Sequence, residues 1–523
     1  MATATEQVTA PPKETSRRWG WVALGIVVFG ILIRLPTIGF PLNEPVDFFP
    51  FRQTQTAVVI REYMQNGLSL HSPLSVLGPP WDVPMEFPLY QLIAAQVGLT
   101  LGWGVDLAAR VTCLAFFEIT AVLLALLARR WFSSGTALLA LALFQVLPFG
   151  FVYGSSSMIE FLPTAALLGG ILAIDTWVRR GDSGSTRNWL LVVGAVLLVI
   201  GFLVKITTAL PWTLIYLAVL INWHGTAGKD GDNNPVAWLR TFVKANTTRV
   251  LGLVPLAAGA VAGLAWTRYA DSVKEQSPYT QFLMSSNLSS WNFGTADQRL
   301  RTENWAAPIE WAGSIAGSGL LLAVVCLAAI LLWPTRRPIT IALAIALPVS
   351  TAVFFNLYVV HNYYLCAIYP ALVLVIAAAI AGCTRLAPTP SVRAVLGITL
   401  TLVAIASAWL SPQGQLISKR TNDPPFNYSQ SIEIASNTNP DDGILVVGCG
   451  WSSEVLYFAD RRGLMLQTQA PPFTHTRLIP YSWLGKDLDY VYLCDPANAD
   501  LTPLFPPEVK LERVTPNLLR IVT

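Results

Sequence analysis

The fold of this chain depends on residues 86–104, which read EFPLYQLIAAQVGLTLGWG. A membrane-spanning helix needs about 20 predominantly apolar residues. This stretch has that length, but it begins with Glu86, carries Gln91 and Gln96, and is interrupted by glycines. Basic residues gather in cytoplasmic loops, and they fall on one side of the membrane only if residues 86–104 do not cross it. We therefore predict that this stretch is a helix lying along the outer membrane surface.

The composition indicates a multi-pass membrane protein. Of the 523 residues 53% are hydrophobic and 12% are charged, and the mean hydropathy is +0.52. These apolar runs are too many for one soluble core. The length rule predicts an all-α polytopic fold with about eleven transmembrane helices, near residues 20–38, 106–128, 133–152, 157–178, 188–204, 207–223, 249–267, 311–333, 338–356, 363–384 and 393–411.

The basic clusters predict which side of the membrane is cytoplasmic. With residues 86–104 on the surface, the following clusters share one side: Arg17-Arg18, Arg129-Arg130, Arg179-Arg180, Lys229/Arg240/Lys244/Arg249, Arg336-Arg337 and Arg385/Arg393. Residues 1–19 then form a cytoplasmic tail, and residues 20–38 an uncleaved signal anchor. We expect a prokaryotic cytoplasmic (inner) membrane protein whose transmembrane domain covers residues 20–411.

Three segments are predicted to face outward: the first outer loop 39–105, the second outer loop 268–310, and the C-terminal region 412–523. The last reads as a small extracytoplasmic α/β domain, with strands near 443–448 and 489–493 and a helix near 452–460. Its Gly448-Cys449-Gly450 turn lacks the third glycine of a nucleotide-binding loop, so no nucleotide site is expected. Cys449 and Cys494 can form a disulfide if this domain faces an oxidising compartment.

Several function classes are disfavoured. The net charge is only +3 and no basic tract alternates with aromatic residues, so nucleic acid is not an expected partner. The four histidines show no metal-ligand spacing. Four cysteines lie in apolar segments and are read as small buried hydrophobic residues, namely Cys113, Cys326, Cys366 and Cys383.

Most of the chemistry in the sequence lies in the first outer loop, where charged residues gather beside a membrane span. Asp47 lies in PVDFFPFRQTQTA, residues 45–57, among aromatic and proline residues. Partial burial of this kind raises the pKa of a carboxyl group and suits a proton acceptor. Glu86 opens the surface helix, where an acid also stabilises the helix dipole. Two acids in one outward loop equally suit binding of a sugar, a metal or an amine.

These motifs resemble GT-C-fold glycosyltransferases of the family 39 type, which include protein O-mannosyltransferases and the lipid A aminoarabinose transferase. The likeness rests on the acid after the first span, the following Arg-Gln-Thr-Gln-Thr-Ala helix and the Glu-Phe-Pro-Leu-Tyr surface helix. It continues through Tyr153 to Glu160, through Lys205, and through His361-Asn362-Tyr363-Tyr364. It covers the chain to about residue 411.

The resemblance implies a sugar donor on a polyprenyl phosphate and an acceptor on the outer face, which is a lipid, a glycan or a protein. Asp47 becomes the catalytic base, and Glu86 a supporting acid or a ligand of substrate or metal. A divalent ion, Mg or Mn, held by Asp47 and Glu86 is one way to balance the phosphate charge. The aminoarabinose transferases have a basic residue where this surface helix begins with Glu86, which is a departure from their pattern.

Such a donor needs cations near its phosphate. Lys205 lies at the predicted outer end of a span, where snorkelling to the interface is the alternative explanation. Arg52, Arg61 and Arg268 are also predicted outward, and arginine suits bidentate phosphate contacts. Gln53 follows Arg52 in the same motif and joins the candidate substrate-binding residues.

Polar residues at other outer turns complete the candidate site. His361 and Tyr363 are predicted to line a cavity and bind the leaving phosphate or sugar hydroxyls. An interfacial aromatic belt explains the tyrosine equally well. Tyr153 and Glu160 are further candidates for the cavity wall.

Two other classes of protein compete with the glycosyltransferase. A lipid or glycan transporter or flippase also needs polar residues near a cavity, but its helices are commonly interrupted, and these spans read as continuous. A non-catalytic scaffold leaves the acids of the first loop unexplained. Within the enzymes, an O-antigen ligase or polymerase would show a late outer loop rich in Arg and His, which this sequence lacks.

Overall fold

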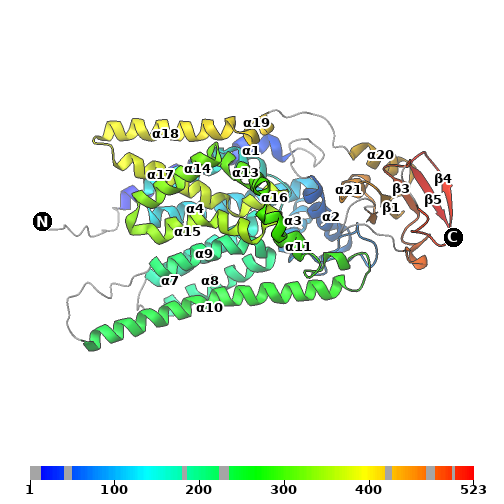
Figure 1. Ribbon diagram of the computed structural model, residues 1–523, viewed down its shortest axis with the longest axis horizontal. Helices are drawn as coiled ribbons and strands as arrows, with labels where there is room; N and C mark the ends of the chain where they lie inside the picture. The colour runs from blue at the N-terminus through cyan, green and yellow to red at the C-terminus, as the bar shows by residue number, and fades with distance from the viewer. Residues whose placement is uncertain are drawn as a thin grey trace.

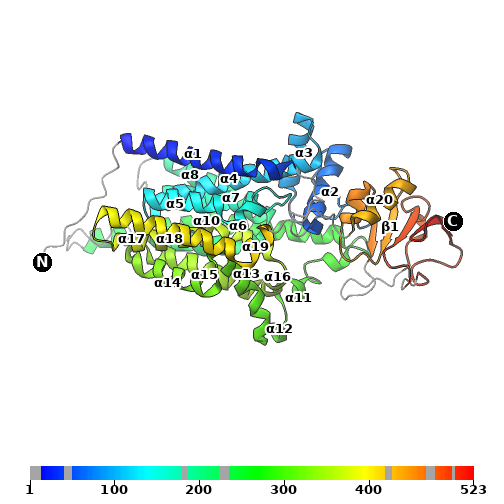
Figure 2. The same cartoon turned by 90° about the horizontal axis from the view of Figure 1, so that it is seen from above.

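Long helices run side by side along the long axis of the molecule, and a small sheet domain lies beyond one end of them (Figures 1 and 2). The computed structural model describes residues 13–39, 50–179, 185–222, 235–418, 427–466, 478–497 and 501–523. Helix α1 (Lys13–Ile38) begins at the end of the bundle opposite the sheet domain (Figure 2).

The bundle consists of helices that match the eleven predicted segments over most of their length. They are α1 (Lys13–Ile38), α4 (Val105–Trp131), α5 (Ser134–Val146), α6 (Pro148–Tyr153), α7 (Phe161–Arg179), α8 (Ser185–Val204), α9 (Ile206–Asn222), α10 (Pro235–Lys274), α13 (Ala306–Ala316), α14 (Gly319–Leu332), α15 (Arg337–Val353), α16 (Phe355–Val360), α17 (Tyr369–Arg385) and α18 (Pro390–Leu410).

The described helices are those of a multi-pass membrane protein. Six of them are long and apolar enough to cross a membrane, and a seventh span results if α13 and α14 count as one bent span. Five further apolar helices among the described residues have 10 to 17 residues. The total of eleven spans stays a prediction, because these shorter helices fall below the roughly 20 residues that a crossing requires.

Two of the predicted spans are broken, so the expectation of continuous spans is wrong there. The segment 311–333 bends by 63° between α13 and α14. At this bend Gly317 has φ 108°, and the Ser318 hydroxyl caps α14 by accepting a hydrogen bond from the Leu321 amide at 3.2 Å. The segment 133–152 breaks at Leu147, because Pro148 starts a new helix without an N–H to donate.

The two longest loops between bundle helices lie at the end nearest the sheet domain. The first loop contains α2 (Pro50–Asn66) and α3 (Leu89–Leu101), and the second contains η1 (Gln281–Leu283), α11 (Ser289–Phe293), α12 (Ala296–Leu300) and η2 (Thr302–Trp305). Shorter connections are η3 (Pro334–Arg336), η4 (Asn362–Ala367) and α19 (Pro412–Ser418). Figures 1 and 2 show α2, α3 and α11 at this end of the bundle.

Helix α3 is the stretch on which the predicted topology depends. It has 13 residues, which span about 20 Å, well short of the roughly 30 Å hydrocarbon layer. Pro88 precedes its first turn, and Gly102 ends it with φ 67°, a left-handed conformation that glycine adopts without strain. Figure 2 shows α3 steeply inclined to α1 and α4. These features agree with a surface helix.

The sheet domain contains α20 (Tyr428–Asn437), α21 (Glu454–Ala459), η5 (Tyr481–Trp483) and five strands, β1 (Ile444–Val447), β2 (Gly463–Leu466), β3 (Tyr490–Leu493), β4 (Lys510–Arg513) and β5 (Leu518–Val522). The strand order is β2-β1-β3-β5-β4. Strand β1 is parallel to β2 and β3, whereas β5 is antiparallel to β3 and β4. The two strands and the helix expected from the sequence are confirmed as β1, β3 and α21, and the domain is α/β.

The first loop covers one edge of this sheet. The amides of Gly463 and Met465, both in the edge strand β2, donate to the carbonyls of Ser75 at 2.9 Å and Val76 at 3.0 Å, and the Gly78 amide donates back to Gly463 at 3.0 Å. An edge strand otherwise presents unpaired backbone groups. Backbone hydrogen bonds therefore join the sheet domain to a loop that lies early in the chain.

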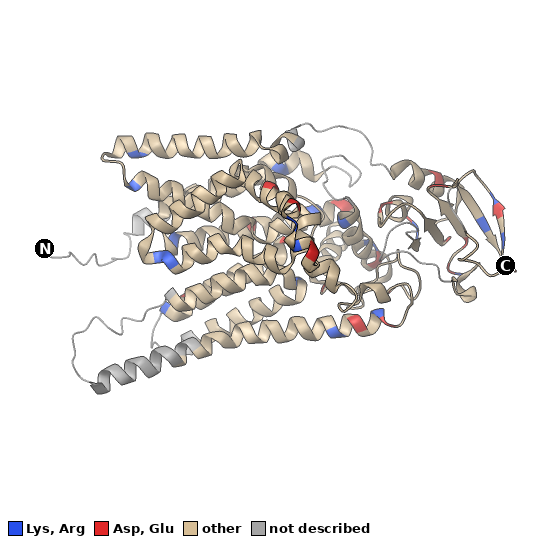
Figure 3. Cartoon of the chain, viewed as in Figure 1, with Lys and Arg blue, Asp and Glu red and all other residues tan. Residues whose placement is uncertain are grey.

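Charged residues are distributed unevenly along the molecule. Basic residues occupy the last turns of α4, α7 and α17, and Figure 3 shows blue residues at the end of the bundle away from the sheet domain. Most acidic residues in Figure 3 lie in the other half, near the loops and in the sheet domain. This asymmetry has the form of the positive-inside pattern.

Candidate functional site

A cavity of about 530 Å³ lies where the loops meet the bundle end. Its volume falls within the usual range of ligand pockets. Five residues that the sequence predicted as site residues line it: Arg52, Glu86, Lys205, His361 and Tyr363. The remaining lining residues are Phe51, Gln55, Met85, Ile206, Thr207, Leu283, Leu288, Trp291, Asn292, Leu357, Tyr364 and Trp451.

Arg52 and Glu86 form an ion pair in the cavity wall. Helix α2 presents Arg52 in its first turn, and the Arg52 Nη1 group also donates to Gln55 Oε1 at 2.8 Å. Burial alone would raise the pKa of Glu86, but the charges of Arg52 and Lys205 outweigh it and hold the pKa below its usual value. Glu86 is therefore an anion here. A guanidinium has five N–H donors, so Arg52 can bind a phosphate oxygen as well as Glu86.

Lys205 and Glu160 form a second, deeper ion pair. Lys205 is the single non-helical residue between α8 and α9, so the break directs its side chain into the cavity wall. Its ammonium lies 5.5 Å from the ring centroid of Tyr363 and 4.9 Å from that of Tyr364, within cation–π range. Lys205 is buried and paired, which does not match the snorkelling alternative.

His361 is packed among aromatic rings beside these cations. Its ring stacks on Tyr363 at 5.0 Å between centroids and lies 5.5 Å from the ring of Phe51. Burial, together with the nearby charges of Arg52 and Lys205, lowers the pKa of His361 from its ordinary value to about 4. The imidazole is thus neutral at physiological pH. Tyr363 is 4% exposed and lines the cavity.

Gln53, Tyr153 and Glu160 lie outside the cavity lining and support its wall, Glu160 through its ion pair with Lys205. The Gln53 side chain accepts a hydrogen bond from the Ser157 amide at 2.7 Å. The Tyr153 hydroxyl donates to Asn362 Oδ1 at 2.6 Å, next to His361. These contacts join α6 and the turn after it to α2 and η4, and both α2 and η4 carry lining residues.

Three other predicted site residues are not found in the cavity wall. Asp47 lies outside the described residues. Arg268 is exposed on α10 and does not line the cavity. Arg61 does not line it either: its guanidinium donates to Asp460 Oδ1 at 2.8 Å and to the Tyr457 carbonyl at 3.2 Å. Arg61 therefore contacts the sheet domain.

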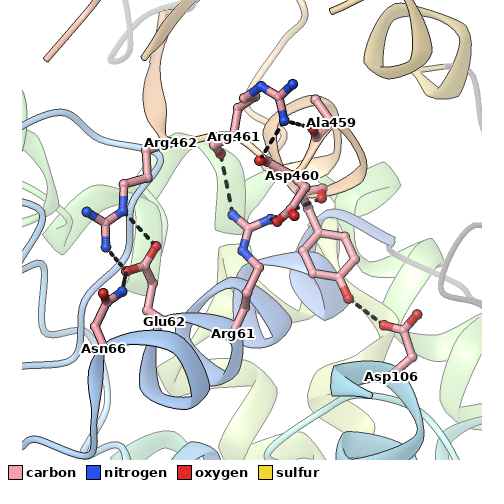
Figure 4. Close-up of polar contacts among 9 residues, drawn as sticks. Arg61, Glu62, Asn66, Asp106, Ala459, Asp460, Arg461 and Arg462 are labelled. Carbon is pink, nitrogen blue, oxygen red and sulfur yellow. Dashed lines mark hydrogen bonds and ion pairs between the residues drawn. The ribbon is translucent and has the colours of Figure 1, made fainter. Parts of the chain in front are cut away.

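Figure 4 shows the polar interface to which Arg61 belongs. Neighbouring Glu62 accepts hydrogen bonds from Arg462 and from Asn66, the latter at 2.9 Å. The Tyr457 hydroxyl donates to Asp106 in the first turn of α4. With the strand pairing described above, these contacts hold α21 against α2 and α4.

Several lining residues were not singled out from the sequence. Trp291 comes from the second outer loop and Trp451 from the sheet domain, so they reach the cavity through long-range packing. The only sequence signal was the presence of large aromatic residues in polar outer segments. Leu283 and Leu288 gave no signal, since single apolar residues in loops are common.

The described residues contain no group of three or more His, Cys, Asp or Glu side chains arranged to hold a metal ion. Of the two predicted metal ligands, Asp47 lies outside the described residues and the carboxylate of Glu86 is occupied by Arg52. We derive no catalytic step through a metal.

Comparison with known proteins identifies the fold. No protein-family model and no curated protein sequence matches the chain. Among solved structures, ArnT from Cupriavidus metallidurans in the apo state superimposes with a TM-score of 0.57 at 14% identity, over 95% of this chain and 98% of that one. The undecaprenyl phosphate complex of the same protein gives 0.56 at 13% identity, over 96% and 98%.

A third similar structure is the archaeal oligosaccharyltransferase AglB from Archaeoglobus fulgidus, in complex with an inhibitory peptide and a dolichol-phosphate. It superimposes with a TM-score of 0.54 at 12% identity, over 92% of this chain and 69% of that one. ArnT and AglB are GT-C fold glycosyltransferases. The chain described here has the GT-C fold, as the sequence resemblance predicted.

Proposed function

We propose that this chain is an integral membrane glycosyltransferase that moves a sugar from a polyprenyl-phosphate donor to an acceptor on the extracytoplasmic face. The observation that carries the proposal is the convergence of Arg52 and Lys205 in one cavity at the loop end of a GT-C fold. Two of the three similar structures described above contain a lipid phosphate, undecaprenyl phosphate in one and dolichol-phosphate in the other.

The proposed reaction is a single inverting displacement. The acceptor hydroxyl or amine attacks the anomeric carbon and its proton passes to Asp47, while the bond between that carbon and the phosphate oxygen breaks. Arg52 and Lys205 stabilise the negative charge that develops on the departing lipid phosphate. His361 is neutral, so it can hydrogen-bond the phosphate or a sugar hydroxyl without adding charge.

The remaining candidates have supporting roles in this proposal. Glu86 fixes the guanidinium of Arg52, and Glu160 fixes the ammonium of Lys205. Tyr363 borders the sugar, while Gln53 and Tyr153 hold the elements that carry the wall. We do not include Arg61 or Arg268, because neither lines the cavity.

The proposed sidedness rests on charge. Basic residues at the bundle end opposite the cavity support a cytoplasmic location for that end, and hence an extracytoplasmic active site. A polyprenyl-phosphate donor in a prokaryotic inner membrane needs no nucleotide on that face.

The central test replaces the proposed base. Asp47→Asn removes the proton acceptor, and we expect transfer from a polyprenyl-phosphate sugar in membranes to fall at least 100-fold, within the usual contribution of a general base. The matched control is Asp297→Asn, because Asp297 is an exposed acid of the second loop that pairs with Arg301. Near-normal turnover of a folded Asp47→Asn variant would remove Asp47 from the mechanism.

A transporter or flippase is the alternative, and the 63° bend between α13 and α14 is the observation in its favour. Proteoliposomes loaded with fluorescent polyprenyl-phosphate sugar separate the two. Movement of the lipid between leaflets without sugar transfer would support the transporter.

Chelation of divalent ions followed by addition of Mg²⁺ or Mn²⁺, in the same preparation, shows whether transfer needs a metal.

A further inference from the structure

One wall of the cavity comes from the sheet domain. Trp451 lies in the turn after β1 and lines the cavity together with Phe51, Leu283 and Trp291. Its ring packs edge-on against Phe282 of the second loop, with 5.3 Å between centroids and an interplanar angle of 90°. The sheet domain thus contributes directly to the cavity that holds the two cations.

The turn that carries Trp451 is fixed on both sides. On the sheet side, Cys449 is joined to Cys494 by a disulfide, with 5.2 Å between the Cα atoms. On the bundle side, Ser453 Oγ lies 2.8 Å from Thr54 Oγ1 and 3.0 Å from the Phe51 carbonyl oxygen. Gly448 and Gly450 have φ of 83° and 72°, so two left-handed residues make the sharp turn between these attachments.

The position of this turn indicates which substrate it meets. Lys205, Ile206 and Thr207 line the cavity from the bundle, the direction from which a lipid-linked donor must enter. Trp451 lines it from the sheet domain, which lies beyond the bundle end (Figure 2). An acceptor approaching from outside the bilayer therefore passes Trp451 first.

The chemistry of Trp451 suits a ring-bearing acceptor. An indole offers a large rigid apolar face with few rotatable bonds, and it is a frequent anchor at recognition sites. Phe51 and Trp291 extend the aromatic surface on the same cavity. The apolar faces of sugar rings fit such a surface, while their hydroxyls are left for polar neighbours such as Asn292.

We propose that Trp451, held in position by the Cys449–Cys494 disulfide, selects the acceptor and that this acceptor is a glycan. The proposal rests on the proposed glycosyltransferase function. Trp451 acts in acceptor binding, whereas the two cysteines act only by positioning it.

The test compares two fates of the same donor. Water can always act as an acceptor, so the rate of donor hydrolysis is measured with purified enzyme and a polyprenyl-phosphate sugar alone. The rate of transfer to a glycan is measured after octyl glycosides are added. For Trp451→Ala we expect a transfer-to-hydrolysis ratio at least 10-fold lower than that of wild type, with a raised KM for the octyl glycoside. Trp451→Phe keeps an aromatic face and should recover part of the ratio.

The matched control is Trp483→Ala, since Trp483 is the other tryptophan of the sheet domain, is partly buried and does not line the cavity. An equal loss in Trp483→Ala would mean that damage to the domain, not loss of the cavity wall, causes the effect. A serine-containing peptide serves as a second probe. If Trp451→Ala lowers transfer to the peptide but not to the glycosides, the glycan assignment is wrong.

The disulfide is tested separately. The double variant Cys449→Ser/Cys494→Ser should lower the transfer-to-hydrolysis ratio as Trp451→Ala does, and a phosphine reductant should reproduce this in wild type but not in the double variant. An unchanged ratio would show that the disulfide does not position Trp451.

If wild type neither hydrolyses a lipid-phosphate sugar nor transfers sugar from it, the proposed function fails. If wild type transfers and Trp451→Ala is normal, only this inference fails.

Discussion

Lys205 and Glu160 form an ion pair in which the side chains are only 4% and 1% exposed. Removing one partner of a buried pair leaves an uncompensated charge and costs about 3–5 kcal/mol. We expect Glu160→Gln and Lys205→Met each to lower the free energy of unfolding by a similar amount, as measured by thermal unfolding in detergent. The double variant Lys205→Met/Glu160→Met should recover most of the stability but not the affinity for the donor phosphate.

The control for this cycle is the exposed pair Asp297 and Arg301, whose side chains are 73% and 59% exposed. Exposed pairs contribute at most about 1 kcal/mol, so Arg301→Met should change little. Recovery of donor affinity in the Lys205→Met/Glu160→Met variant would contradict a phosphate-binding role for Lys205.

Arg52 is predicted to bind the donor phosphate through its planar guanidinium. A charge-assisted hydrogen bond contributes about 1.5–3 kcal/mol, so Arg52→Ala should raise the donor KM roughly 10- to 150-fold. Arg52→Lys keeps the charge but loses the planar guanidinium that binds two oxygens. Its donor KM should lie between that of wild type and that of Arg52→Ala. Arg268→Ala is the control, since Arg268 is exposed outside the cavity lining. An equal rise in KM for Arg268→Ala would contradict the assignment.

The pKa of His361 makes a prediction about acid stability. Its folded-state pKa of about 4 lies below the ordinary value of 6.5. Between these values the unfolded chain binds a proton that the folded chain does not, so the free energy of unfolding falls as pH drops through this window and is unaffected above it. His361→Asn should lose less stability than wild type between pH 7.5 and pH 4.5 in thermal unfolding. The exposed His71→Asn should behave as wild type, and equal losses in all three proteins would contradict the prediction.

The interface of Figure 4 is predicted to control how firmly the sheet domain is held. Arg61→Ala removes the hydrogen bonds to Asp460 and Tyr457, so the amides of Gly463 and Met465 should exchange hydrogen faster, by at least 10-fold. Arg513→Ala, an exposed change on β4, should leave their exchange unchanged. Slow exchange in Arg61→Ala would show that the strand pairing alone holds the domain.

The sequence predicted the parts of the fold that follow from local pattern. Apolar runs gave the bundle segments, and strand-like composition gave β1 and β3. The sidedness of the basic clusters, with the glutamines and glycines of residues 86–104, predicted a surface helix. The break at Gly317 was missed, because a glycine in an apolar run is usually tolerated within a helix. The edge pairing of β2 was missed, because it joins backbone groups and leaves no mark on side chains.

Site residues could be predicted where a charged residue lies beside an apolar segment of the sequence. Glu86 and Lys205 were found this way, since a charge near a membrane is costly and needs a partner or a purpose. The same reasoning could not separate Arg52 from Arg61. Both lie on α2, and only the three-dimensional packing shows that one lines the cavity while the other contacts the sheet domain. Trp451 was missed because nothing local distinguishes it.

The pairing of residues 75–78 with β2 also has a consequence during biosynthesis. The N-terminal partner of this pairing leaves the ribosome long before β2 and the turn that bears Trp451. Until the late segment has been synthesised and has docked, the cavity lacks one wall and the early loop has no strand to pair with. On the acceptor-selection proposal above, a nascent chain therefore reaches the membrane with both cations in place before the residue that selects the acceptor has been synthesised.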